Sequence, residues 1–306
     1  MPRISPKLFR LASQIDARLP FLLRESKGNV QQAQTELRWI TDELRSPLLV
    51  KKACLQRFEH VPLQYILKNQ PFGDLEVLTR RGVLIPRWET EEWCLDLIRN
   101  VIGPSKEKNM KVADLCSGSG CIALQIAFSK PDAEVIAVDI SSKAVRLIGE
   151  NVEHNGLQDA KVQVVQADIL KTPCEVVPGC RFDLITCNPP YIPENEFVAE
   201  CTTSVKMYEP RSALIGNLEF YRNLVEYWVK EGRTDSFVYE VGSIEQCNYV
   251  MNAIDETVKE KWHVGVKYDS NNQARCVYGY LAEGKKDYHS MFERFKIKSN
   301  DICTII

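Results

Sequence analysis

The chain has 306 residues, 44% hydrophobic and 26% charged, which is ordinary for a globular protein and sufficient for one large domain or two smaller ones. No apolar run approaches the roughly 20 residues that a membrane-spanning helix needs, so we expect no membrane association. The formal net charge of -2 argues against general electrostatic binding of nucleic acid. None of the 11 cysteines forms a CxxC pair and the 4 histidines are not clustered, so neither a metal site nor a disulfide framework is expected.

Charge is distributed unevenly along the chain. Residues 1–60 hold 11 Lys/Arg against 6 Asp/Glu, a balance of +5, which leaves -7 for the remainder. In the first 20 residues, apolar side chains recur at helical spacing with Lys7, Arg10 and Arg18 among them. An amphipathic, basic start with few acidic residues is typical of a mitochondrial targeting segment, which we favour. The alternative is the first helix of a helical domain with a basic outer face.

Residues 1–68 are predicted to form a helical N-terminal domain, with breaks near Gly28 and Pro47. Two short strands are expected next, over residues 72–79 and 83–85, with a turn at Arg81-Gly82. This β-hairpin linker, residues 69–88, would join the helical domain to a larger one that spans residues 89–306.

From residue 111 onward, strand and helix patterns alternate. Strands are expected over residues 112–115, 134–138, 162–166, 182–187, 236–241, 262–268 and 274–281. The intervening helices are expected over residues 122–128, 142–154, 218–229 and 244–258, after a first helix over 90–102. This alternation predicts an α/β fold whose mostly parallel, seven-stranded, Rossmann-like sheet is covered on both faces. The short turn at residues 269–272 forces an antiparallel final pair.

The first predicted turn of this sheet contains small residues. Cys116, Ser117, Gly118, Ser119 and Gly120 lie where the strand meets a helix whose free N–H groups can face a bound ligand. These residues are candidate cofactor contacts. Gly118 and Gly120 also fit the looser dinucleotide fingerprint, so the motif alone does not select one cofactor.

Three further residues at strand ends are candidate cofactor contacts. Asp139 ends the second strand, where it could accept both hydroxyls of a ribose, as in nicotinamide and S-adenosylmethionine enzymes. It could instead cap the helix beside Ser141. Asp168 and Ile169 end the third strand, where an adenine could meet a carboxylate and an apolar side chain, although a plain turn aspartate explains Asp168 as well.

The fourth strand runs into Asn188-Pro189-Pro190-Tyr191. The two prolines end the strand and hold their carbonyls with little freedom, beside an amide and an aromatic ring. The stretch therefore predicts a rigid receptor for a planar group with N–H donors, although it could be only a turn. Asn188 and Pro189 would each accept one N–H, and Tyr191 would stack on the planar group. No histidine is expected at the crevice, which favours methyl transfer from S-adenosylmethionine over hydride transfer.

Jointly, the motifs resemble those of the release-factor glutamine methyltransferases called HemK or PrmC. The resemblance rests on Pro62-Leu63-Gln64-Tyr65-Ile66, Ile85-Pro86-Arg87, Thr90-Glu91, Asp114 to Gly120, Asn188 to Tyr191, Glu209-Pro210, Ala213-Leu214 and Glu240-Val241-Gly242. It implies methylation of the glutamine in the Gly-Gly-Gln motif of a class 1 peptide chain release factor. Together with the basic N-terminal segment, these motifs resemble most the organellar branch of this family in eukaryotes.

The resemblance also implies roles for residues of this chain. Cys116 to Gly120, Asp139, Ile169 and Asn188 would contact S-adenosylmethionine, and Asn188 to Tyr191 would hold the glutamine amide. The N-terminal helical domain would help to dock the protein substrate. We expect a monomer that binds a release factor and makes no sequence-specific contact with nucleic acid.

Two other functions stay open at this point. An adenine-N6 methyltransferase would use the same receptor on an exocyclic amine, and a binding or assembly factor could keep the fold without turnover. Cys116 supports the latter, because it replaces the first glycine of the family's loop and would be strained at a positive φ. Two milder departures are Trp88, in place of a proline, and Asn271, where a glycine is usual in the last hairpin.

Overall fold

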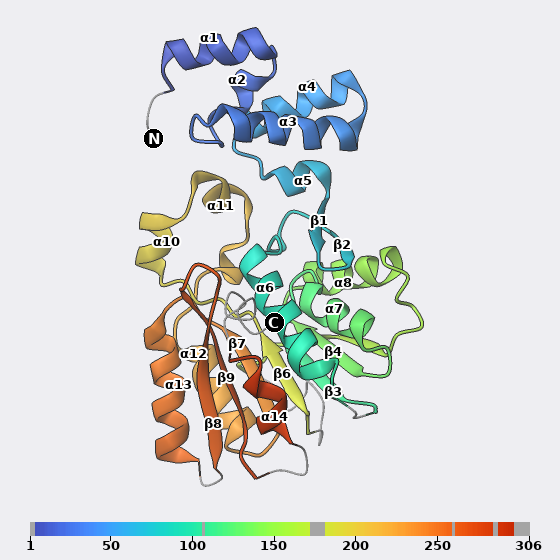
Figure 1. Cartoon of the computed structure of the whole chain (residues 1–306), viewed down its shortest axis with the longest axis vertical. Coiled ribbons are helices and arrows are strands. Elements are labelled where there is room, and N and C mark those ends of the chain that lie inside the picture. Colours follow the sequence, from blue (N-terminus) through green and yellow to red (C-terminus); the bar gives the residue numbers. More distant parts are fainter. Residues whose placement is uncertain (1–3, 106–107, 172–180, 259–260, 284–286, 297–306) are drawn as a thin grey trace, which may run out of the picture.

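The computed structural model of the protein describes residues 4–105, 108–171, 181–258, 261–283 and 287–296 (Figure 1). The outer ends of the first and last predicted domains, residues 1–3 and 297–306, lie outside these ranges. No described helix is long and apolar enough to cross a membrane.

The N-terminal part consists of helices and forms the upper layer of Figure 1. These are α1 (Pro6–Ile15), α2 (Leu19–Leu22), α3 (Val30–Leu44), α4 (Pro47–Phe58) and α5 (Leu63–Leu67). Local chemistry sets their starts: the Asn29 side chain accepts a hydrogen bond from the Gln32 amide at 3.0 Å, and prolines open α1 and α4. The helices bury a core of their own, which includes Leu22, Ile40 and Ala53. The predicted helical character is confirmed for the described residues 4–68, and the domain boundary stays a prediction.

A β-hairpin follows, but its turn is not where the sequence predicted it. It pairs β1 (Asn69–Phe72) with β2 (Leu75–Leu78) around a turn at Gly73-Asp74. The predicted turn at Arg81-Gly82 is present, and the Val83 amide donates to the Arg80 carbonyl across it at 3.2 Å, but no strand follows it, so the strand predicted over 83–85 and its pairing were wrong. Gly73 has φ +57°, which suits a tight hairpin turn, and a Cβ there would lie 2.6 Å from the Gln125 side chain.

The larger part contains the predicted seven-stranded mixed sheet. Its strands are β3 (Lys111–Leu115), β4 (Glu134–Asp139), β5 (Val162–Gln166), β6 (Leu184–Cys187), β7 (Ser236–Glu240), β8 (Trp262–Tyr268) and β9 (Ala274–Leu281). They lie in the order β5-β4-β3-β6-β7-β9-β8. The first five are parallel, and β9 is antiparallel to both β7 and β8. The predicted fold class is confirmed.

Helices cover both faces of this sheet. They are α6 (Trp88–Leu97), α7 (Cys121–Ser129), α8 (Ser142–His154), α12 (Glu219–Asn223), α13 (Ile244–Thr257) and α14 (Tyr288–Glu293). Two further helices, α10 (Glu194–Glu200) and α11 (Thr203–Tyr208), lie in the segment between β6 and α12. π-helical turns extend α6 over Ile98–Ile102 and α12 over Leu224–Val229. One core holds apolar residues of α6, α7 and α14, and the other holds residues of α12 and α13, so the sheet is buried on both sides.

The final hairpin has the turn predicted at residues 269–272, with one difference. Asn272, not Asn271, takes the left-handed conformation, at φ +61°. The Asp269 carboxylate accepts hydrogen bonds from the amides of Asn271 and Gln273, which hold this turn.

Candidate active site

A cavity of about 270 Å³ opens at the carboxyl ends of the parallel strands. Its floor comes from the loops that follow β3, β4, β5 and β6. Because the chain fills one side of β3 with β4 and β5 and then returns to its other side with β6, this is the switch point of the sheet, where ligands bind in open α/β folds. Residues 82–87, Pro210, Ser212 and Ala213 line the cavity from outside the sheet.

The small-residue loop after β3 forms one wall of the cavity. Cys116, Gly118 and Gly120 all have positive φ, at +54°, +58° and +83°. A positive φ strains a residue that has a Cβ, so the backbone of Cys116 is strained, as its place in this loop led us to expect. A Cβ on Gly120 would lie 3.1 Å from Ile148 of α8, so glycine there lets the loop approach the helix closely. Cys116 to Ser119 line the cavity, whereas Gly120 does not.

Asp114 holds this loop to the neighbouring strand. Its carboxylate accepts hydrogen bonds from the hydroxyls of Ser117 and, at 2.9 Å, Thr186 of β6. Burial raises the pKa of Asp114 to about 7, although both hydrogen bonds act in the opposite direction. The buried carboxyl group therefore links the loop after β3 to the strand that carries Asn188.

Asp139 lies at the end of β4 and lines the cavity. Its carboxylate oxygens accept the backbone amides of Gly118 and Ser141, each at 2.8 Å, and burial raises its pKa. The alternative role as the helix cap falls to Ser141 instead, whose side chain accepts the Ala144 amide at the start of α8. Each carboxylate oxygen of Asp139 keeps a second lone pair, so its contacts with the two amides leave Asp139 able to accept ribose hydroxyls as well.

Asp168 and Ile169 also line the cavity, on the side of β5. Asp168 accepts the Leu170 amide at 3.0 Å and forms an ion pair with Lys171 at 3.4 Å. Ile169 is buried, and exposed Ile140 and Leu170 lie near it on the cavity wall. This wall is apolar with a carboxylate at its edge, as an adenine site requires.

Asn188 lies at the end of β6 and lines the cavity, and a chain of buried hydrogen bonds fixes its orientation. Asn188 Nδ2 donates to Thr90 Oγ1 at 3.0 Å, and Thr90 Oγ1 donates to Glu240 Oε2 at 2.7 Å. The indole N–H of Trp93 can only donate, and it bonds the same Glu240 oxygen at 2.8 Å. Oε2 is thus an acceptor, and the Thr90 hydroxyl uses its one proton there. Thr90 can therefore only accept from Asn188, which leaves Asn188 Oδ1 as the oxygen available to a ligand.

In the rest of the Asn188-Pro189-Pro190-Tyr191 stretch, Tyr191 contacts residues at the end of β7 and just after it, and not the cavity. Pro190 lines the cavity, whereas Pro189 and Tyr191 are not among its lining residues. The Tyr191 hydroxyl donates to Glu240 Oε1 at 3.0 Å, and its ring packs against Gly242, where a Cβ would approach to 2.8 Å. Burial raises the pKa of Tyr191. Tyr191 therefore lies beneath the cavity, so its predicted stacking on a substrate stays a prediction.

Thr90 and Glu240 are the residues that sequence reasoning left without a role. Both belong to motifs that carried the resemblance, and Glu240 ends β7, the strand beside β6. Burial raises the pKa of Glu240, and the donors Trp93, Thr90 and Tyr191 counter that effect. The signal available was an acidic residue ending a fully buried strand.

Arg87 and Glu209 tie the outer wall together. Glu209 is buried and accepts hydrogen bonds from Arg87 Nη2 at 2.8 Å and the Ile85 amide at 3.2 Å. Its charge acts to raise the pKa of Arg87. Glu209 therefore fixes residues 85–87 to the segment that follows α11.

The sheet order and the cavity at its switch point define a class I, S-adenosylmethionine-dependent methyltransferase. The residues present fit this cofactor: Asp139 suits a ribose, the wall of Ile140, Ile169 and Leu170 suits an adenine, and the tight loop after β3 allows close approach of a charged tail.

Comparisons with known proteins also indicate a methyltransferase fold. A family model described as Methyltransferase small domain matches residues 97–206. The N-terminal domain of human METTL16 in complex with SAH has a TM-score of 0.51 at 17% identity, covering 76% of this chain and 84% of that one, which shows the fold alone.

Curated relatives narrow the class. The mitochondrial MRF1 N(5)-glutamine methyltransferase MTQ1 of Saccharomyces cerevisiae is 43% identical over 301 residues, covering 96% of this chain and 94% of the relative. A probable enzyme of the same description from Schizosaccharomyces pombe is 33% identical over 90% of this chain and 96% of its own. A release factor glutamine methyltransferase of Clostridium acetobutylicum is 36% identical over 65% and 68%. The chain belongs to the release factor N5-glutamine methyltransferase family.

Proposed function

We propose that this protein transfers the methyl group of S-adenosylmethionine to the side-chain amide nitrogen of the glutamine in the Gly-Gly-Gln motif of a mitochondrial class 1 peptide chain release factor. The family membership supports the reaction, and the names of both fungal relatives support the mitochondrion and an MRF1-type substrate. The observation that carries the proposal is the orientation of Asn188, whose Oδ1 is left as a fixed acceptor on the cavity wall.

The residues of the chain orient a weak nucleophile. The lone pair of an amide nitrogen is delocalised into the carbonyl, so alignment matters more than strength. Asn188 Oδ1 and the Pro189 carbonyl would each accept one N–H of the glutamine, which turns the nitrogen toward the methyl group. Both acceptors also stabilise the positive charge that grows on this nitrogen.

S-adenosylmethionine, when bound, supplies a sulfonium methyl group electrophilic enough to react without a strong base. Asp139 and the wall of Ile169 would hold its adenosyl part, and the loop from Cys116 to Gly120 would face its amino-acid part. The bond between nitrogen and the methyl group would form as the bond between that methyl group and sulfur breaks, so the products are S-adenosylhomocysteine and N5-methylglutamine, and one N–H proton passes to water.

A labelled-methyl assay tests the reaction. Purified protein and labelled S-adenosylmethionine are incubated with a release factor, with the same factor carrying alanine in place of the glutamine, or with RNA. We expect label only in the release factor that keeps the glutamine, and mass spectrometry should place the label on the side-chain nitrogen of that glutamine. Label in RNA would instead support the adenine-N6 alternative, and no label in any acceptor would support a factor without turnover.

No specific observation favours the adenine alternative. The hMettl16 catalytic domain solved in complex with the MAT2A 3′UTR hairpin 1 is similar in fold, with a TM-score of 0.53, but is only 14% identical to this chain. The expectation of a monomer also stays a prediction.

A further inference from the structure

The segment between the Asn188 motif and Glu209 leaves the active site and returns to it. At its start, the Ile192 amide donates to the Leu214 carbonyl at 2.9 Å, and the Gly216 amide donates to the Ile192 carbonyl at 3.1 Å. The two ends of the excursion are therefore fixed to each other beside Pro190. Between them, α10 and α11 project from the sheet toward the N-terminal helices (Figure 1).

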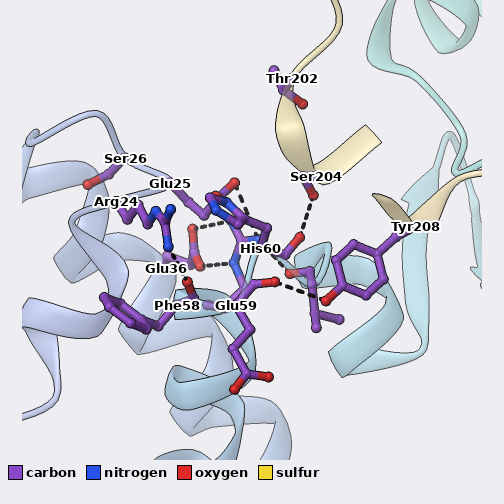
Figure 2. A network of polar contacts seen from close by, with 12 residues as sticks. Arg24, Glu25, Ser26, Glu36, Phe58, Glu59, His60, Thr202, Ser204 and Tyr208 are labelled. Carbon is purple, nitrogen blue, oxygen red and sulfur yellow. Dashed lines mark hydrogen bonds and ion pairs between the residues drawn. The ribbon is translucent and has the colours of Figure 1, made fainter. Parts of the chain in front are cut away.

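The far end of this excursion meets the end of α4, as Figure 2 shows. The hydroxyl of Ser204 donates to the backbone carbonyl of His60 at 2.7 Å, and that of Tyr208 donates to the carbonyl of Glu59 at 2.9 Å. Carbonyls at the end of a helix have no partner within that helix. Two consecutive ones are satisfied here by side chains from α11, more than 140 positions away in the sequence.

A buried polar cluster holds these carbonyls in place. His60 Nδ1 lies 2.5 Å from Glu25 Oε1, and Arg57 Nη1 donates to the Val61 carbonyl at 2.6 Å. Arg57 Nε also donates to Glu36 Oε1 at 2.5 Å. His60 has φ +67°, a conformation that persists only where surrounding contacts determine it. The acceptor end of the contact is therefore rigid.

The near end of α11 is tied to the cavity. The Tyr208 ring lies under the guanidinium of Arg81, whose Cζ is 4.9 Å from the ring centroid. The next residue, Glu209, bonds Ile85 and Arg87, and both of these residues line the cavity. The helix α11 thus contacts the segment after α4 through Ser204 and Tyr208, and the residue that follows it, Glu209, bonds the cavity wall.

The N-terminal helices have a second attachment through α5 and the hairpin. The Tyr65 hydroxyl donates to the Val83 carbonyl at 2.7 Å, and the Thr79 hydroxyl donates to the Gln64 carbonyl at 2.8 Å. A body attached at one place can swing about it, whereas two separate attachments set its orientation. The contacts of α11 supply the second one.

We propose that α11 is a strut that sets the position of the N-terminal helices over the cavity, with Ser204 and Tyr208 as positioning residues for the protein substrate. This inference rests on the proposed function. Large apolar side chains are exposed on α3 and α4, among them Trp39, Leu48 and Leu55, and such side chains suit a protein partner. A substrate that contacts these helices while its glutamine enters the cavity needs a fixed separation between the two sites.

The kinetic test uses the full chain with Ser204→Ala and Tyr208→Phe combined. Loss of two hydrogen bonds is expected to raise KM for the release factor about tenfold. The value of kcat and the Kd of S-adenosylmethionine should stay within about twofold, because neither residue touches the cavity. Ser204→Thr keeps a hydroxyl and should retain the wild-type KM, and Tyr249→Phe on α13 is the matched tyrosine control. A KM unchanged in the double variant, or a loss confined to kcat, would overturn the proposal.

Hydrogen exchange tests the strut without any substrate. In the double variant, the amides of α11 should exchange about tenfold faster than in the wild type, while those of the central sheet should not change. Unchanged exchange in α11 would overturn the strut. If the wild type fails to methylate a release factor, the proposed function is wrong, and the exchange measurement still decides whether α11 braces the N-terminal helices.

Discussion

Cys116 adopts a left-handed backbone conformation in a loop where the family pattern has glycine. The left-handed region costs a residue with a Cβ roughly 1–2 kcal/mol. The side chain nevertheless packs against the core that contains Cys187, so the thiol recovers part of that cost through burial. The two contributions can be separated by two substitutions that both remove the thiol.

We expect Cys116→Gly to be more stable than Cys116→Ala by about 1 kcal/mol, because only alanine retains the left-handed penalty. At an ordinary position the order is the reverse, since glycine is the less stable by about 0.5–1 kcal/mol. Urea unfolding of both variants, with equal m-values, measures the difference. Alanine equal to or more stable than glycine would show that Cys116 is not strained.

Asn188 permits a test of the proposed receptor itself. Asn188→Ala should lower kcat by about 100-fold or more, because the acceptor that orients the glutamine nitrogen is lost. Binding of S-adenosylmethionine should change little, since Asp139 and the loop after β3 are untouched. Calorimetric titration of the variant with cofactor, beside the methylation assay, checks both parts. Unchanged turnover would remove Asn188 from the reaction.

At the scale of elements, the segment that returns from α11 packs directly against the receptor. A Cβ on Gly216 would lie 2.2 Å from the Pro190 carbonyl oxygen, which is backbone and cannot move freely. We expect Gly216→Ala to destabilise the protein by about 1–3 kcal/mol and to lower kcat, because it displaces Pro190. Gly149→Ala in α8 is the matched control, since a Cβ at that position would have nothing within 4 Å of it. That substitution should stabilise the helix by about 0.5–1 kcal/mol, and wild-type behaviour of Gly216→Ala in unfolding and turnover would contradict the contact.

The elements that could be predicted from the sequence are those whose ends carry local signals. The bounds of β5 and α8 match the prediction to the residue, and α8 follows its Ser141 cap. The hairpin turn was misplaced because Gly73-Asp74 lies inside the stretch predicted as one strand, residues 72–79. Its register depends on α8, where Asn151 accepts the Leu78 amide at 2.7 Å from 73 positions away. A contact between residues so far apart in the sequence produces no pattern in the sequence around either of them.

The candidate site follows the same division. Residues that end parallel strands could be predicted to meet, and most of them line the cavity. The orientation of Asn188 could not be predicted, because it depends on Thr90, 98 positions away, and on the contact of Thr90 with Glu240, 150 positions away. Only the folded chain brings these three side chains together.

At the scale of the whole molecule, the N-terminal helices and the sheet bury separate cores. They are joined by the hairpin and by the contacts of α11, which are polar and few. This arrangement predicts that the two parts open independently, even though the strut orients them. A ligand that binds only one part should therefore stabilise that part alone.

We expect S-adenosylmethionine at 100 times its Kd to slow exchange of the most protected amides in β3, β4 and β6 by about 100-fold, which corresponds to about 2.7 kcal/mol. The protected amides of α3 and α4 should keep their rates, because their core does not contact the cavity. Hydrogen exchange with and without cofactor measures both in one sample. Asp139→Ala at the same cofactor concentration is the control, since weaker binding should reduce the effect in the sheet and leave the helices as they are. Equal slowing in α3 and α4 would mean that the chain unfolds as one cooperative unit, with the strut and hairpin binding the two cores together more firmly than their contacts indicate.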